Sequence, residues 1–258
     1  MTDLVPGAEL RILVFGQSNA TGEHLADPLQ AWPKLVAAEL GAHLKRPTSL
    51  VIRPIYVHAP GVEKYLDREL ERYRPDVVLL GASAFAFAQK MVVVSVRRRF
   101  GNRVASGYQW LESRADRTTR HSEAGTRANR LARRTMIKLF GAEPVAAYAT
   151  VIDGLAAALK RLAREEQLSV TVFQMNPIAA ADGDAAISKQ IAAFDAEVLE
   201  MAHRWHFALL DIRAPMNNAP DQGSMLFPDR LHYTRRAHRI MADCVLRAFA
   251  DGTIPVPG

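Results

Sequence analysis

Short apolar runs alternate with amphipathic helical stretches along most of this chain, and that alternation constrains the fold most strongly. The runs that read as buried strands are residues 11–15, 50–57, 76–80, 168–175 and 207–212. Helical periodicity covers residues 29–40, 62–73, 146–166, 187–205 and 235–249. Strands joined through helices of this length pair in parallel with right-handed crossovers. The sequence therefore predicts one α/β domain over residues 1–258, with a central parallel sheet of about five strands.

One expected strand contains a proline. Pro54 lies inside the run 50–57, and proline cannot donate a hydrogen bond to a neighbouring strand. We therefore expect this strand at an edge of the sheet, or with a bulge.

The positive charge of the chain is concentrated in one segment. The chain has 33 Lys and Arg against 27 Asp and Glu, a net charge of +6. Residues 97–138 hold twelve Lys and Arg and three Asp and Glu, so this segment carries +9 and the remainder −3. We interpret residues 97–140 as an Arg-rich helical segment inserted into the domain.

Two stripes are predicted on a helix of this insertion. Four basic residues at steps of three and four share one face: Arg127, Arg130, Arg134 and Lys138. A neighbouring stripe could pack onto the body of the protein: Leu131, Thr135 and Leu139. The basic face is either solvated or faces an anionic ligand or surface. Nucleic acid is not the expected partner, because neither interleaved aromatic residues nor a nucleic-acid-binding motif accompanies the charges.

Composition excludes several other classes of protein. A single cysteine, Cys244, excludes a disulfide framework and a cysteine-rich zinc module. The N-terminal residues lack the pattern of a secretory signal, and no run of 18 apolar residues occurs, so a cytoplasmic location is expected. His203 and His206 flank Trp205, but a metal site would need a third ligand from elsewhere. We expect no metal and no cofactor.

Two motifs near opposite ends of the chain carry the chemistry. The first strand leads into Gly16-Gln17-Ser18-Asn19, and ligands of open α/β sheets bind at the carboxyl ends of strands. Asp229 and His232 lie three residues apart just before the last helix. A carboxylate at this spacing can accept a hydrogen bond from one imidazole nitrogen, which orients the other nitrogen as a general base. A serine hydroxyl needs such a base to become a nucleophile.

Taken together, the serine turn and the Asp-x-x-His motif resemble the SGNH hydrolase superfamily, the GDSL-type lipases, esterases and acyltransferases. The resemblance follows the whole chain in order except for the insertion. It implies a flavodoxin-like three-layer sandwich, with Ser18 as nucleophile, His232 as base and Asp229 as the partner that orients His232. Small-molecule esters are the implied substrates.

The resemblance also implies an oxyanion hole, in which backbone N–H groups of Ser18 and Gly61 act as donors. The family's third donor is an asparagine after the third strand, and Ser83 occupies that position here. The loss of one such donor typically costs on the order of 10²–10³ in rate. The hydroxyl of Ser83 could substitute, and so could the amide of Asn19 or Asn102.

Three further residues are candidates for substrate contact: Asn19, Phe85 and Trp110. Phe85 follows the third strand, where a pocket would open. Trp110 could either wall an acyl pocket or anchor the insertion.

The Gly-Gln-Ser-Asn turn is similar to that of carbohydrate acetylesterases such as the sialate O-acetylesterases, which favours a polar acylated substrate. Alternative functions are an acyltransferase that passes the acyl group to a sugar or other alcohol, and a weakly catalytic binding protein that uses its basic insertion.

Overall fold

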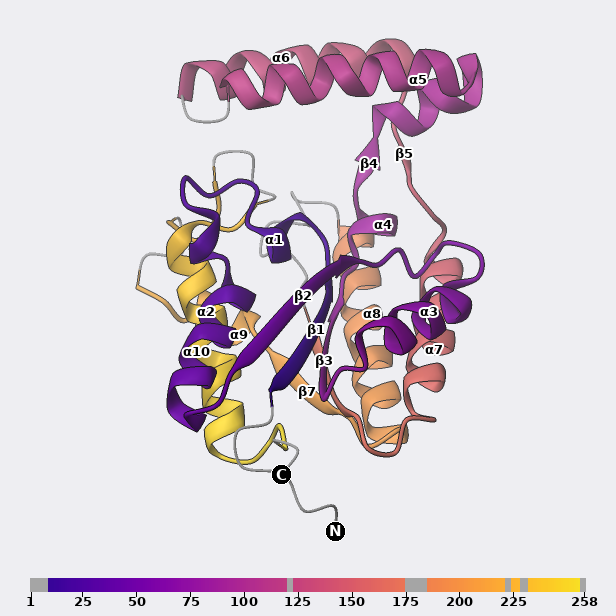
Figure 1. Ribbon diagram of the computed structural model, residues 1–258. Coiled ribbons are helices and arrows are strands. Elements are labelled where there is room, and N and C mark those ends of the chain that lie inside the picture. Colours follow the sequence, from indigo (N-terminus) through magenta and orange to yellow (C-terminus); the bar gives the residue numbers. More distant parts are fainter. Residues whose placement is uncertain (1–8, 120–122, 175–184, 221–223, 228–231, 256–258) are drawn as a thin grey trace.

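Five parallel strands form the central sheet of the computed structural model, which describes residues 9–119, 123–174, 185–220, 224–227 and 232–255 (Figure 1). In spatial order these strands are β2 (Thr48–Pro54), β1 (Leu10–Gly16), β3 (Val77–Ala82), β6 (Ser169–Gln174) and β7 (Ala208–Asp211). The predicted parallel sheet of five strands is confirmed. β2 forms one edge of the sheet and ends at Pro54, as the proline predicted.

Helices cover both faces of the sheet, which confirms the three-layer α/β architecture. One layer consists of α2 (Trp32–Leu44), α9 (Arg213–Asn217) and α10 (Arg235–Ala250), with the short 3-10 helix η1 (Pro28–Gln30). The other layer consists of α3 (Val62–Tyr73), α4 (Phe85–Ala88), α7 (Tyr148–Leu162) and α8 (Ala185–Arg204). Successive residues of β1 point to opposite layers: Ile12 and Val14 to the first, Leu13 and Phe15 to the second.

A buried histidine joins two helices of the first layer. Nδ1 of His238 on α10 accepts a hydrogen bond from the backbone N–H of Trp32, at 3.2 Å. That N–H belongs to the first turn of α2 and has no acceptor within its own helix. Burial, with a smaller contribution from His232, lowers the pKa of His238 to about 4. The ring is therefore neutral at neutral pH, which leaves Nδ1 able to accept.

The insertion is a helical hairpin raised above the body on a two-stranded ribbon (Figure 1). The ribbon pairs β4 (Lys90–Met91) with β5 (Glu143–Pro144) in antiparallel orientation. Between them run α5 (Val92–Thr119) and α6 (Glu123–Phe140). Gly101 interrupts α5 with φ 82° and ψ 176°, a conformation that glycine alone adopts readily. No described helix combines the length and apolar character that crossing a membrane requires.

The hairpin has a small apolar core of its own. Val92, Val96 and Ala105 of α5 are buried in it, and Met136 and Phe140 of α6 pack against them. The expectation that Leu131, Thr135 and Leu139 could pack onto the body is wrong. Leu131 is 67% exposed and Leu139 is 63% exposed, and Thr135 is also exposed. The ribbon holds this stripe away from the sheet, so no described layer of the body covers it.

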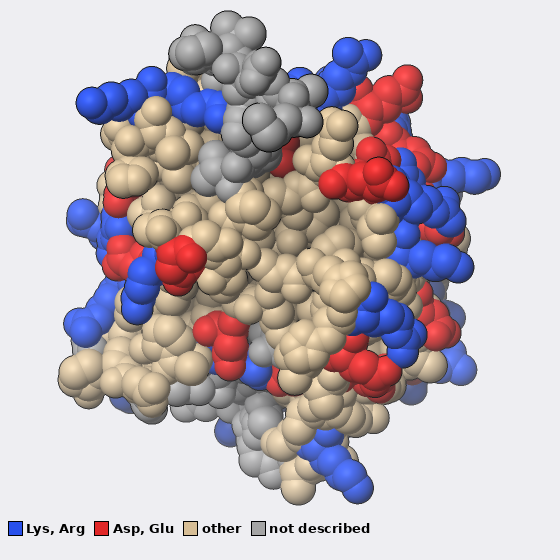
Figure 2. Space-filling view, turned by 90° about the horizontal axis from the view of Figure 1, so that it is seen from below, with Lys and Arg blue, Asp and Glu red and all other residues tan. Residues whose placement is uncertain are grey.

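The body of the molecule presents a different surface from the hairpin. Figure 2 shows the end of the body opposite the hairpin, where Lys and Arg side chains lie beside Asp and Glu around a largely uncharged centre. One of the ion pairs of the body joins Arg11 to Asp76 at 2.9 Å. The positive charge of the chain is therefore a property of the hairpin rather than of the whole molecule.

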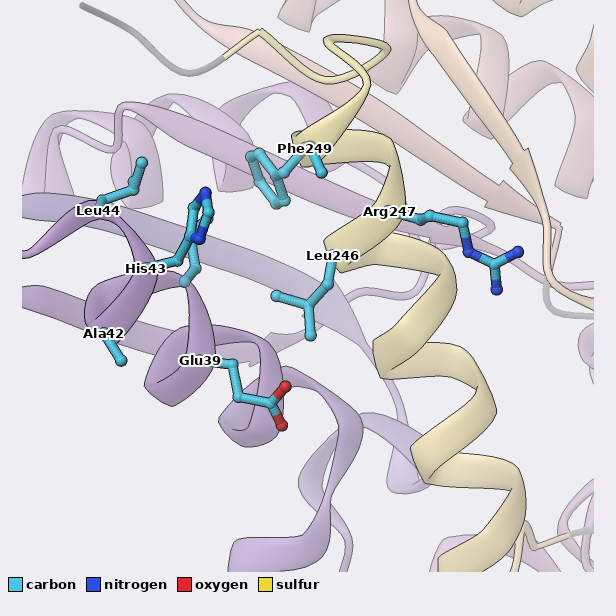
Figure 3. Close-up of a pocket in the computed structure, with 9 residues that line it drawn as sticks. Glu39, Ala42, His43, Leu44, Leu246, Arg247 and Phe249 are labelled. Atoms are coloured by element: carbon cyan, nitrogen blue, oxygen red, sulfur yellow. The ribbon is translucent and has the colours of Figure 1, made fainter.

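A pocket of about 630 Å³ opens between the carboxyl-terminal ends of α2 and α10 (Figure 3). Leu246 and Phe249 of α10 point toward His43 and Leu44 of α2, while Arg247 points away (Figure 3). Helices that connect parallel strands run antiparallel to them, so this pocket lies at the amino end of the sheet. It is thus remote from the loops in which the sequence places the chemistry.

Candidate active site

Three loops that carry predicted site residues follow adjacent strands. Ser18 comes two residues after β1, Gly61 precedes α3 in the loop after β2, and Ser83 follows β3 directly. Because β2, β1 and β3 are neighbours in a parallel sheet, their carboxyl ends meet at one edge. The structure thus places the three loops at the same end of the sheet.

The side chains of Ser18 and His232 lie together although 214 residues separate them. Ser18 begins the short helix α1 (Ser18–Thr21), and its Oγ lies 3.2 Å from Nε2 of His232. This is a hydrogen-bonding distance, so an unprotonated Nε2 can accept the hydrogen of the hydroxyl. A nucleophile within reach of a base is the geometry that serine-dependent acyl transfer requires.

Backbone hydrogen bonds on both sides of a short loop position His232. Leu226 and Tyr233 form an antiparallel bridge, and the N–H of Phe227 donates to the carbonyl of His232 at 2.8 Å. The N–H of Thr234 donates to the carbonyl of Met225 at 3.0 Å. Asp229, the expected partner of His232, lies outside the described residues.

Asn19 connects the serine turn to the histidine loop. Its side-chain oxygen accepts a hydrogen bond from the backbone N–H of Tyr233 at 3.0 Å. Tyr233 is buried and adjacent to His232. The sequence assigned Asn19 to substrate contact or to the oxyanion hole; the structure shows its oxygen joined to the residue after the histidine. Asn19 is therefore a candidate positioning residue for the contact between Ser18 and His232.

For an enzyme in which Ser18 is the nucleophile and His232 the base, as the sequence predicts, removal of this connection should slow catalysis without weakening substrate binding. We expect Asn19→Ala to lower kcat for ester hydrolysis by about 10-fold to 100-fold, because small displacements of a base reduce rates by this much. KM should change little. Steady-state kinetics on a p-nitrophenyl ester measures both values, and Asn218→Ala, at an exposed position after α9, is the matched control. An unchanged kcat would contradict the positioning role.

The candidate oxyanion donors have distinct local geometries. The N–H of Ser18 is at the first position of α1, where a helix supplies no acceptor of its own. Gly61 has φ 78° and precedes α3, and its carbonyl accepts from the N–H of Tyr65 at 3.0 Å. The hydroxyl oxygen of half-buried Ser83 accepts from the N–H of Phe85 at 3.2 Å, which leaves the hydroxyl hydrogen available for donation. Ser18, Gly61 and Ser83 therefore all remain candidate oxyanion donors.

The remaining predicted contact residues lie in different settings. Phe85 is half-buried at the start of α4, directly beyond Ser83, where it can face a pocket. Trp110 lies on α5 and is 55% exposed, with the guanidinium of Arg114 5.4 Å from its ring centre. Asn102 is exposed just beyond the break in α5 at Gly101. Trp110 and Asn102 thus belong to the hairpin rather than to the loops around Ser18.

One residue of the candidate site was not predicted from the sequence. The ring of His24 lies against the ring of His232, with centroids 3.2 Å apart and an angle of 37° between the planes. This contact restricts how the imidazole of His232 can turn. A single histidine six residues after Ser18 matches no motif, so its contact with His232 can be recognised only in the folded structure. Within the described part of the chain, no group of three His, Cys, Asp or Glu residues could hold a metal ion.

Several solved structures with a similar fold are described as esterases or lipases. Neither a family sequence model nor a curated protein sequence matches the chain. The structure is similar to the psychrotrophic esterase EstA from Pseudoalteromonas sp., with TM-score 0.53, 14% identity and coverage of 93% of this chain and 97% of that one. A member of the lipolytic G-D-S-L family from Veillonella parvula gives TM-score 0.56, 13% identity and coverage of 94% and 99%.

A third similar structure is a two-domain esterase described as active on acetylated mannans. It gives TM-score 0.55 and 9% identity, over 98% of this chain and 52% of that one. At these identities the likeness concerns the path of the backbone. The chain therefore has the α/β fold of the SGNH hydrolases, the GDSL-type esterases and lipases.

Proposed function

We propose that this protein is a serine esterase that hydrolyses esters through an acyl-enzyme on Ser18. The observation that carries the proposal is the 3.2 Å separation of Ser18 Oγ and His232 Nε2. The fold supports it, since the similar solved structures are esterases and lipases. In the proposed reaction His232 accepts the proton of Ser18 as Oγ bonds to the ester carbonyl carbon.

The rest of the cycle follows from the same groups. The carbonyl oxygen gains negative charge, which the N–H groups of Ser18 and Gly61 and the hydroxyl of Ser83 would stabilise. Collapse of this intermediate breaks the bond to the alcohol, which leaves with the proton held by His232. Water then attacks the acyl group on Ser18, with His232 as base, and releases the acid. In this scheme Asp229 accepts a hydrogen bond from the other ring nitrogen of His232.

For the substrate, we propose a small O-acyl group, such as acetyl, on a polar or carbohydrate alcohol. Two observations support this class: the Gly16-Gln17-Ser18-Asn19 turn, and the similarity to an esterase described as active on acetylated mannans. The exposed side chains of the hairpin favour hydrolysis over transfer to an alcohol. Leu131 and Leu139 face solvent rather than pack onto the body, so they provide no dry roof over the site.

Covalent labelling tests the assignment of Ser18. A p-nitrophenyl phosphonate ester should modify the protein once and stop hydrolysis of p-nitrophenyl acetate. After trypsin cleavage the label should lie on peptide 12–34, in which Ser18 is the only serine. Ser18→Ala protein should stay unlabelled. A label on another peptide, or equal labelling of the Ser18→Ala protein, would refute the proposal.

A further inference from the structure

The α5–α6 hairpin exposes more large apolar side chains than are expected of a helix pair that contacts only water. Eleven large hydrophobic residues are more than a third exposed in the described part of the chain, and seven of them lie on this hairpin. These seven are Phe100, Val104, Trp110, Leu111, Leu131, Ile137 and Leu139. Leu131 and Leu139 lie eight positions apart on α6 and therefore on one side of that helix. Exposed apolar patches on soluble proteins mark interaction surfaces.

Cationic side chains lie among these apolar ones. Eight described Lys and Arg side chains of the hairpin are exposed: Arg97, Arg98, Arg99, Arg103, Arg114, Arg127, Arg134 and Lys138. On α6, Leu131 shares a helical face with Arg127, Arg134 and Lys138, because these positions are three, four or seven residues from it. On α5, the guanidinium of Arg114 lies over the ring of Trp110. A partner of this surface must therefore offer negative charge to the Lys and Arg side chains and an apolar layer to the apolar side chains beside them.

We infer that the hairpin is a docking element for an anionic phospholipid surface. The headgroups of such a surface attract Lys and Arg, and the boundary with the acyl chains accepts Leu, Phe and Trp side chains. A second copy of the hairpin fits poorly, because two strongly positive faces repel each other. Nucleic acid would satisfy the cations, but it offers no apolar layer for the leucine side chains.

The ribbon makes this docking geometrically possible. β4 and β5 carry the hairpin beyond the edge of the body, so its faces reach a flat surface before the body does (Figure 1). The body contributes little attraction, since it bears both charge signs and a net −3 outside residues 97–138. Docking would therefore depend on hairpin residues alone, and this dependence can be tested.

Vesicle co-sedimentation of the full chain tests the inference. We expect binding to vesicles of phosphatidylcholine with 30% phosphatidylglycerol at about 0.1 M salt, and none to pure phosphatidylcholine vesicles. Arg127→Glu/Arg134→Glu/Lys138→Glu should weaken binding by about 100-fold or more, because each cation near such a surface contributes about 1 kcal/mol. Leu131→Ser/Leu139→Ser should weaken it by about tenfold while the net charge stays the same.

A matched control separates surface docking from a general charge effect. Lys64→Glu/Arg164→Glu/Lys189→Glu changes the net charge by the same amount at exposed positions of the body, and it should bind as the unaltered protein does. Circular dichroism confirms that each variant is folded. Equal losses in the control and hairpin variants would overturn the inference. So would leucine-independent binding to vesicles, or a dimer in solution that the leucine variant disrupts.

Nucleic acid is a further outcome of the same experiment. Duplex DNA added at equal anionic charge should not displace the protein from vesicles. DNA binding at least as tight as vesicle binding, lost in the Arg/Lys variant and kept in the leucine variant, would reassign the surface to nucleic acid.

Discussion

Replacement of Ser18 by alanine is expected to lower kcat for ester hydrolysis by about 10⁴-fold to 10⁶-fold, with the protein still folded. The reason is that Ser18 Oγ, 3.2 Å from Nε2 of His232, is the only protein atom that bonds to the carbonyl carbon in the proposed mechanism. His232→Ala should cost about as much, since the hydroxyl then has no base. The double variant should be no slower than either single one, because the two groups act as a unit.

The measurement is the rate of p-nitrophenyl acetate hydrolysis at saturating substrate, with circular dichroism for each variant. His43→Ala is the matched control for the histidine change, because His43 is exposed at the other end of the sheet. It should leave kcat unchanged. If Ser18→Ala keeps activity within tenfold of the unaltered protein, Ser18 is not the nucleophile.

Replacement of Gly154 by alanine should destabilise the protein strongly, although alanine is the better helix former. Gly154 lies within α7, and a Cβ atom there would be 1.8 Å from the backbone oxygen of Val57 and 2.7 Å from its carbonyl carbon. Backbone cannot yield as the end of a flexible side chain can, so the helix and the loop must separate. We expect the free energy of unfolding to fall by about 2–3 kcal/mol.

The same change should reduce catalysis, because the displaced loop leads from β2 to Gly61. Urea unfolding and steady-state kinetics of Gly154→Ala measure the two effects. Gly107→Ala is the matched control: it also lies within a helix, and a Cβ there meets no atom within 4 Å. That variant should be as stable as the unaltered protein or more stable by up to about 1 kcal/mol. Equal stability of the two variants would contradict the close approach of α7 and the loop.

The features predicted from sequence are those that depend on local periodicity and chain order. Residues 12–15 of the first strand are all apolar because both faces of that strand are covered, and Pro54 marked the edge of the sheet. Ser18 and His232 were paired through two motifs in the right order, and their side chains lie within hydrogen-bonding distance. At these positions the local sequence pattern predicts the arrangement that the folded structure has.

The features that sequence did not predict depend on what lies opposite a residue in space. The repeat of Leu131 and Leu139 shows that they lie on one side of a helix, but not whether another layer covers that side. β4 and β5 have two residues each, too few to show alternation. The contact of His24 with His232 and the approach of Gly154 to Val57 join segments with no shared pattern. Each needs the folded chain.

The two-residue ribbon also makes the hairpin an exchangeable module. Met91 and Glu143 are paired across the ribbon, and paired antiparallel residues lie about 5 Å apart, a gap that a two-residue turn closes. Everything between them enters and leaves the body at one point, and its apolar core is separate from the two cores that flank the sheet. A lineage could lengthen, replace or lose this hairpin without altering any strand of the sheet. The proposed docking surface can thus evolve independently of the chemistry proposed for Ser18 and His232.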